Sequence, residues 1–147
     1  MPESLKQRIR SDLNTARRTQ DKARTLLLTT TLSEIHNREI ELGHELSDEE
    51  VIEVVGRAIK RRHEAAEQMR GGKRLELAEK EEREAQMLAQ YLPPALTEAE
   101  VRELARVAIA GGAKNLGAVM SRLMPQIKGR YGGKEANRIV REELGAG

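Results

Sequence analysis

Three positively charged side chains recur at helical spacing near the end of the chain: Lys134, Arg138 and Arg141. At about 100° per residue they fall within about 60° of one another, so one helix face would present a row of cations. Lysine attracts phosphate oxygens as a point charge, and arginine grips a phosphate with two parallel N–H groups. The sequence therefore predicts a polyanion-binding surface here, extended by the cations that precede the helix. The candidate residues are Lys114, Arg122, Lys128, Arg130, Lys134, Arg138 and Arg141.

A second basic cluster, within residues 57–74, has seven Lys or Arg side chains against two acidic ones. Glu53–Arg57 and Lys60–Glu64 have the four-residue spacing of ion pairs within a helix. The cluster therefore suits either internal ion pairs or a second nucleic-acid surface. The row near the chain end has its own alternative, an ordinary solvated helix face.

The net charge of +2 hides blocks of opposite sign. Residues 1–24 hold seven basic side chains against three acidic ones, whereas residues 34–53 hold one basic against eight acidic. The first-helix cluster, Arg8–Arg24, could bind nucleic acid, or it could face the acidic block of its own or another chain.

The remaining polar residues form no arrangement typical of catalysis. The chain has no cysteine, which excludes disulfides, thiolate metal ligands and a cysteine nucleophile. No two of His36, His44 and His63 are four residues apart, so we predict no metal site. No Ser or Thr stands beside a histidine base, and no glycine-rich phosphate loop follows a strand. We expect a protein that is not an enzyme by itself and that uses no cofactor.

Composition and helix-start signals predict an all-α fold. Aromatic residues make up 1% of the chain, whereas Ala, Leu, Glu, Arg and Lys, which favour helix, are abundant. Capping boxes are expected to begin helices at Ser4 and Ser47. Helical periodicity places Ile40, Leu75 and Ala89 among the core-facing residues.

The Pro93-Pro94 pair is the strongest break in the sequence. We therefore expect a four-helix N-terminal region of long hairpins in residues 1–93 and a small three-helix domain in residues 94–147. No run approaches the roughly 20 apolar residues of a membrane span, and the N-terminus lacks the apolar stretch of a signal peptide. We expect a soluble, cytoplasmic protein.

The segment between the last two predicted helices is expected to turn sharply. Pro125 disfavours helical geometry in the residue before it, which predicts a helix end near Leu123. Gly129, Gly132 and Gly133 would let the backbone adopt positive φ.

The tail contains a spaced set of residues that follows the pattern G-x-V-M-x-x-L-M-P-x-x-K-G-R-x-D-G-x-x-x-x-x-x-V. The matching residues are Gly117, Val119, Met120, Leu123, Met124, Pro125, Lys128, Gly129, Arg130, Gly133 and Val140. Gly132 departs from the pattern, which usually has an acidic residue there that would cap the last helix. With Leu46–Val51 and Tyr91–Pro94, this set resembles the YqeY family, small bacterial proteins related to the C-terminal tail of GatB.

GatB is the tRNA-handling subunit of the amidotransferase that makes Gln-tRNA(Gln) and Asn-tRNA(Asn). The resemblance implies a bacterial-like, GatB-tail-like protein that binds the tRNA body and assists an aminoacyl-tRNA synthetase or an amidotransferase. It would also confer the label of a carbon–nitrogen ligase with glutamine as amide donor, although we find no active-site residue for that reaction.

A non-catalytic tRNA-binding accessory protein is therefore the leading hypothesis. Structured RNA is recognised largely through shape, backbone and 2′-OH contacts, whereas single-strand binding needs aromatic platforms that this chain scarcely has. Tyr131 could stack on a base or pack against its own turn. The alternative is a helical module for protein–protein interaction or self-association without RNA binding.

Overall fold

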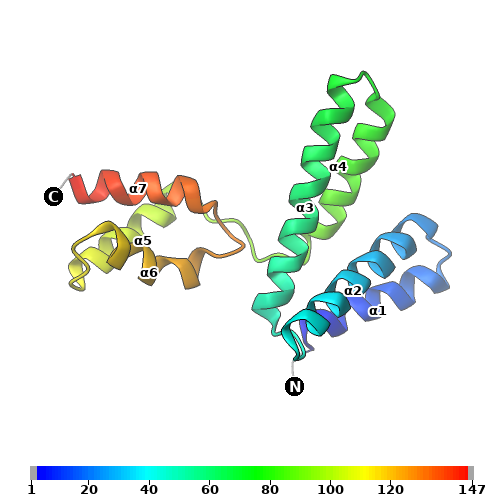
Figure 1. Cartoon of the computed structure of the whole chain (residues 1–147), viewed down its shortest axis with the longest axis horizontal. Helices are drawn as coiled ribbons and strands as arrows, with labels where there is room; N and C mark the ends of the chain where they lie inside the picture. Colours follow the sequence, from blue (N-terminus) through cyan, green and yellow to red (C-terminus); the bar gives the residue numbers. More distant parts are fainter. Residues whose placement is uncertain (1–2, 146–147) are drawn as a thin grey trace. The chain divides into compact units, whose positions relative to one another are not determined.

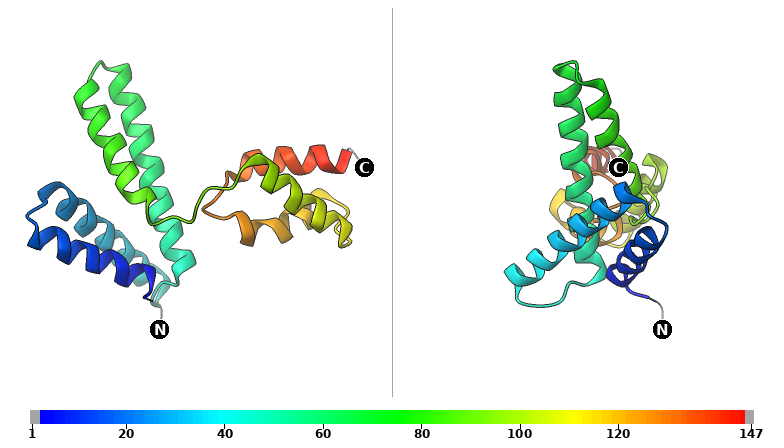
Figure 2. Two further views of the ribbon diagram at one scale, coloured as in Figure 1. Left: turned by 180° about the vertical axis from the view of Figure 1, so that it is seen from behind. Right: turned by 90° about the vertical axis from the view of Figure 1, so that its right-hand side faces the viewer.

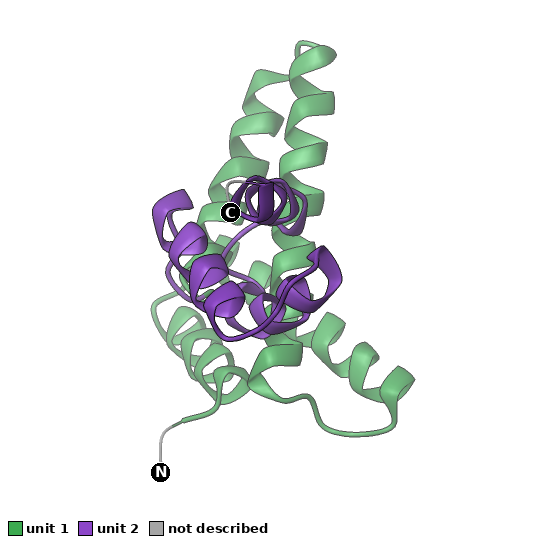
Figure 3. Ribbon diagram, turned by 90° about the vertical axis from the view of Figure 1, so that its left-hand side faces the viewer, with its two compact units in different colours: residues 1–92 green, residues 93–147 purple. Residues whose placement is uncertain are grey.

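Residues 3–145 fold entirely into helices and connecting turns. The structure is a computed structural model that describes residues 3–145, and within them it has seven α-helices and no strand. It divides into two compact units, unit 1 (Met1–Leu92) and unit 2 (Pro93–Gly147), shown in Figure 1 and coloured in Figure 3. The prediction of an all-α fold is confirmed. The helices are α1 (Leu5–Arg18), α2 (Lys22–Leu42), α3 (Asp48–Gly71), α4 (Leu75–Ala89), α5 (Glu98–Ala110), α6 (Leu116–Ile127) and α7 (Gly133–Gly145).

Unit 1 consists of two helical hairpins, α1–α2 and α3–α4, each closed by a short turn (Figure 2). Capping boxes at Ser4 and Ser47 begin α1 and α3, as their sequence spacing predicts. Asp21 caps α2 by accepting the backbone N–H of Arg24 at 3.1 Å. Gly43 ends α2 with φ of 77°, a left-handed conformation that glycine adopts without steric cost.

The core of unit 1 is aliphatic, and Tyr91 adds one hydrogen-bonded aromatic ring to it. The Tyr91 hydroxyl donates to the Asp12 carboxylate at 2.5 Å, and the Arg8 guanidinium lies 5.0 Å from the ring centroid. Burial and the neighbouring Asp12 carboxylate raise the pKa of the Tyr91 hydroxyl. These contacts fasten the residues that follow α4 to α1. The largest fully buried side chains of this core are Ile9, Leu28, Ile35, Val51, Val55 and Leu88.

Three side chains that the periodicity places inward in unit 1 are exposed: Ile40, Leu75 and Ala89. Ile40 lies about 140° around α2 from the buried Ile35, so the two cannot share a face. Leu75 and Ala89 are the first and last residues of α4, and Ala89 lies about 100° around the helix from the buried Leu88.

Unit 2 is a three-helix domain with its own aliphatic core. Its connecting segment is held to the α6–α7 turn, because the Leu96 N–H donates to the Arg130 carbonyl at 2.8 Å. Thr97 then caps α5 by accepting the Glu100 N–H at 3.1 Å. The fully buried core residues are Val101, Ala105, Val119, Leu123, Ile127, Ala136, Ile139 and Val140.

The expected end of α6 near Leu123 is wrong, because the helix continues through Pro125 to Ile127. Proline in a helix interior removes one backbone hydrogen bond and usually costs about 3 kcal/mol. Ile127 is fully buried one turn beyond the buried Leu123, so core packing favours the extra turn. The Lys128 N–H still donates to the Met124 carbonyl at 3.0 Å.

The turn between α6 and α7 uses one left-handed glycine where the sequence predicts three. Gly129 has φ of 74°, whereas Gly132 and Gly133 do not adopt positive φ. Gly133 instead forms the first residue of α7. Among the described residues, no helix is both long enough and apolar enough to span a bilayer.

Candidate nucleic-acid interface

Helix α7 presents one buried face and one charged face, as its sequence predicts. Ala136, Ile139 and Val140 are fully buried, while Lys134 and Arg141 are exposed on the other side. This packing fixes the helix so that Lys134 and Arg141 project from unit 2.

Arg138, at the middle of the predicted row, does not project as a free cation. Its guanidinium lies 2.9 Å from the Glu98 carboxylate of α5, 3.0 Å from Glu135 and 2.8 Å from Glu142. The hydrogen bonds that Arg138 donates to these three carboxylates, the one to Glu98 first, raise the pKa of Arg138. The row is therefore interrupted by an ion-pair network.

The network extends along α5 through two further arginines. Arg102 lies 2.5 Å from Glu142, and Arg106 lies 3.2 Å from Glu143. Hydrogen bonds from Arg102 and then Arg138 lower the pKa of Glu142, while Arg106 holds down the pKa of Glu143. These pairs join α5 to α7 outside the aliphatic core.

The network separates the charges of unit 2. Its sequence has nine Lys or Arg residues and six Glu residues. Five of the Glu residues form ion pairs with Arg102, Arg106 or Arg138, and the sixth, Glu100, bonds its own helix cap at Thr97. The carboxylates thus gather where α5 meets α7. Within residues 3–145, Lys134, Arg141 and Lys114 form no ion pair or side-chain hydrogen bond.

Arg130 has a structural role in the turn between α6 and α7. Its Nε donates to the Pro94 carbonyl at 3.1 Å, and its own carbonyl accepts the Leu96 N–H. The side chain therefore holds the segment before α5 against the α6–α7 turn. Lys128, two residues earlier, is exposed in the same turn.

Lys114 and Arg122 belong to a different corner of unit 2. Lys114 precedes α6, and the Arg122 guanidinium donates to the Ala108 carbonyl at 3.2 Å, at the end of α5. Because α6 has 12 residues, about 18 Å of helix separate Lys114 from Lys128. The structure brings Lys128, Arg130 and Lys134 together around one turn and leaves Lys114 and Arg122 at the opposite end of α6.

Comparison with known proteins shows the family of this chain. The model of a family described as Yqey-like protein matches residues 6–144. The chain belongs to the YqeY family. It is 30% identical over 145 residues to "Altered inheritance of mitochondria protein 41, mitochondrial" of Pyrenophora tritici-repentis. This alignment covers 95% of this chain and 80% of that protein. It is 49% identical over 47 residues to an uncharacterized protein of Schizosaccharomyces pombe, covering 32% of this chain and 38% of that protein.

The name of the Pyrenophora tritici-repentis relative places that protein in mitochondria. The bacterial-like character and the cytoplasmic location of this chain therefore stay predictions.

Gly132 stands where the YqeY pattern usually has an acidic residue. Helix α7 nevertheless begins beside it, with the Ala136 N–H donating to the Gly132 carbonyl at 3.0 Å. In the described part of the chain, no side chain accepts the first N–H groups of α7.

Tyr131, the only aromatic residue of unit 2, is partly buried against the unit's core, which favours a packing role over base stacking.

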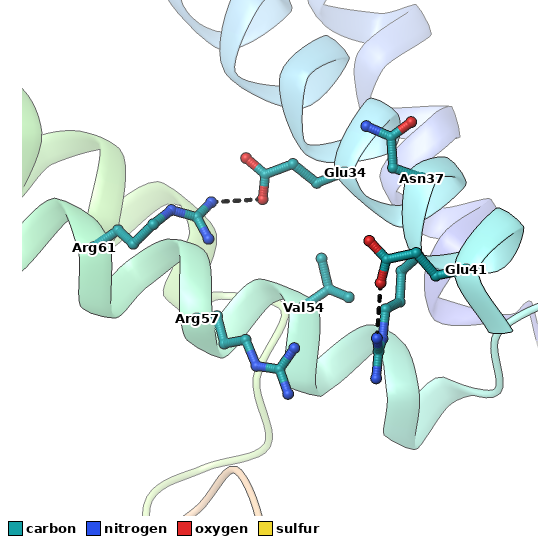
Figure 4. A pocket seen from close by; sticks show the side chains of 7 residues that line it. Glu34, Asn37, Glu41, Val54, Arg57 and Arg61 are labelled. Atoms are coloured by element: carbon teal, nitrogen blue, oxygen red, sulfur yellow. Dashed lines mark hydrogen bonds and ion pairs between the residues drawn. The ribbon is translucent and has the colours of Figure 1, made fainter.

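The second basic cluster is mostly occupied by ion pairs, as its spacing indicates. Arg57 lies 4.0 Å from Glu53, and Arg61 on α3 lies 2.7 Å from Glu34 on α2. Figure 4 shows the latter pair across a hollow of about 330 Å³ between the two helices. Lys73, at the α3–α4 turn, and Arg74 form no such pair within residues 3–145.

No group of three or more His, Asp or Glu residues in the described chain is placed to hold a metal ion. Each histidine has single carboxylate neighbours, such as His63, which lies 3.0 Å from Glu82.

The sequence analysis did not predict the α5–α7 network, although the four-residue spacings of Glu98–Arg102 and Arg138–Glu142 indicated two of its pairs.

Proposed function

We propose that unit 2 binds the phosphate backbone of structured RNA, with tRNA as the ligand. Lys128, Lys134 and Arg141 make the principal contacts, and Lys114 and Arg122 supply secondary contacts at the other end of α6. The chain acts without chemistry of its own, as an accessory to an enzyme that aminoacylates tRNA or amidates aminoacyl-tRNA.

The segregation of charge in unit 2 carries this proposal. The carboxylates pair with Arg102, Arg106 and Arg138, so they do not neutralise Lys134 and Arg141. Exposed cations that form no ion pair attract phosphates and release counterions on contact. A fixed helix face with few aromatic groups suits a folded, backbone-presenting RNA better than an unstacked single strand.

The resemblance to the tail of GatB supports tRNA as the RNA, because that tail belongs to a tRNA-handling subunit. The contacts of Arg138 and Arg130 give these two candidate residues a different role from that of Lys134 and Arg141. Arg138 fastens α7 to α5 and Arg130 fastens the connecting segment, so both hold the surface in place. Their contribution to affinity is indirect.

The test compares two double variants in binding to fluorescently labelled tRNA at several salt concentrations. Lys134→Ala/Arg141→Ala removes two exposed cations of α7 that have no ion-pair partner in residues 3–145. We expect weaker binding and a salt slope reduced by about 1.4, taking about 0.7 per lost phosphate contact. Helicity and melting temperature should stay unchanged, because surface substitutions that break no contact are close to neutral.

Lys73→Ala/Arg74→Ala is the matched control, since it also removes two cations without a described ion-pair partner, but from unit 1. We expect it to bind tRNA as the wild type does. Equal weakening by both variants would indicate attraction by net charge alone. Unchanged binding in the α7 variant would contradict the proposed surface.

A further inference from the structure

The outward face of α2 carries two exposed aliphatic side chains at matched positions. Leu26 is 66% exposed and Ile40 is 67% exposed, although most of the large aliphatic residues of unit 1 are at least half-buried. They are two heptads apart, about 21 Å along the helix axis and within about 40° of one another. Ser33 lies midway between them and is also exposed.

Polar residues of modest size complete this stripe. Thr30 and Asn37 are exposed and give, with Leu26, Ser33 and Ile40, the alternating four- and three-residue spacing of a helix-pairing seam. Small side chains near Ser33 would let a second helix approach closely, while Leu26 and Ile40 would cover the ends of the contact. The seam faces away from the core stripe of α2, which comprises Leu27, Leu28, Thr31 and Ile35.

The two ends of the seam carry opposite charge. Arg17 and Lys22 lie at the α1–α2 turn and form no ion pair within residues 3–145. With Leu26 they line a hollow of about 630 Å³ between the two helices. Beyond the other end of α2, the Glu45 side chain is 80% exposed. It lies 3.5 Å from one cation, Lys6.

We propose that α2 pairs antiparallel with α2 of a second copy of this chain, across a two-fold axis at Ser33. This arrangement places Leu26 of each copy against Ile40 of the other, because Ser33 is equidistant from both. It also brings the cationic turn of each copy, Arg17 and Lys22, to the acidic end of the other. The same residues thus form both sides of the interface, as a two-fold dimer requires.

The seam contains only one helix per copy, so the interface lies at the small end of specific interfaces and the dimer is weak. Its population therefore depends on protein concentration. The RNA surface proposed above lies on unit 2, so dimer formation and RNA binding can be measured independently.

The first test is sedimentation of the full chain over about a hundredfold range of concentration. We expect a reversible monomer–dimer equilibrium, with the dissociation constant raised at least about tenfold by Leu26→Glu or by Ile40→Glu, because each puts a charge into the buried seam. Leu75→Glu is the matched control, since Leu75 is 61% exposed on α4. A chain that stays monomeric, or equal loss in the Leu75 variant, would overturn the proposal.

The second test uses the absence of native cysteine, which makes any introduced thiol unique. Under a mild thiol oxidant, Ser33→Cys should form a disulfide-linked dimer much faster than Gln86→Cys on the exposed side of α4. A mixture of Leu26→Cys and Ile40→Cys chains should cross-link faster than Leu26→Cys alone. Equal rates for Ser33→Cys and Gln86→Cys would refute the pairing, and faster linking of Leu26→Cys to itself would refute the antiparallel direction.

Discussion

The Arg138 guanidinium of α7 lies 2.9 Å from the Glu98 carboxylate at the start of α5, and this contact joins the first and last helices of unit 2. It makes Arg138 part of the scaffold of the cationic surface. Neighbouring Lys134 forms no ion pair within residues 3–145, so two cations on the same helix face have different roles.

We expect Arg138→Ala to lower the melting temperature of unit 2 by a few degrees, because Glu98, Glu135 and Glu142 lose a shared cation. Lys134→Ala should leave the melting temperature unchanged. Thermal unfolding followed by circular dichroism in a segment of residues 93–147 measures both. Equal stability of the two variants would show that the network contributes nothing measurable.

Acid should weaken unit 2 through the same carboxylates. Hydrogen bonds from Arg138 and Arg106 lower the pKa of Glu98 and Glu143, respectively, from the ordinary 4.5. Groups with a depressed folded-state pKa stabilise the fold above their unfolded pKa, and this stability is lost as the pH falls through the folded pKa. We expect a flat melting temperature from neutral pH to about 5 and a decline below about 4.5.

An Arg102→Gln/Arg138→Gln variant provides the control for the acid experiment. It should melt lower at neutral pH and decline less steeply in acid, because fewer carboxylates retain a lowered pKa. A wild-type melting temperature that stays constant well below pH 4.5 would contradict the assignment of these pairs.

Pro125→Ala should stabilise unit 2 by about 1 kcal/mol. The substitution restores a backbone N–H inside α6, and the gain exceeds the added freedom of the unfolded chain, about 0.4–1 kcal/mol. Urea unfolding of the wild type and the variant measures the difference, with exposed Met124→Ala as a control nearby. Destabilisation by Pro125→Ala would mean that the proline's fixed φ shapes the following turn.

Limited proteolysis should cut the chain near residues 92–95 and release a folded unit 2. Tyr91 is fastened to Asp12, and Leu96 is fastened to Arg130, so this short stretch lies between two anchored positions. The released fragment should keep its helicity. Cleavage that begins inside α3 or α4 would argue against two separately stable units.

Local features of this fold follow from the sequence because their determinants are close together. The capping box at Ser47 needs only Glu50, and Asp21 needs only the N–H of Arg24. The continuation of α6 through Pro125 depends on burial of Ile127 against other helices. Rules based on neighbouring residues in the sequence do not include such contacts.

The candidate site shows the same limit. Helical spacing placed Lys134 and Arg141 correctly on the exposed face of α7. The ion pairing of Arg138 depends in part on Glu98, which is 40 residues away in sequence. The separation of Lys114 from the α6–α7 turn likewise required the true length of α6.

The aromatic content of the chain gives each unit one intrinsic chromophore. The two tyrosines are Tyr91 in unit 1 and Tyr131 in unit 2, and the chain has no tryptophan or phenylalanine. Because the Tyr91 hydroxyl is buried against Asp12 and has a raised pKa, its ionisation in alkaline solution should await opening of unit 1. Replacing either tyrosine by phenylalanine would thus leave an ultraviolet signal that reports on a single unit, without any attached dye.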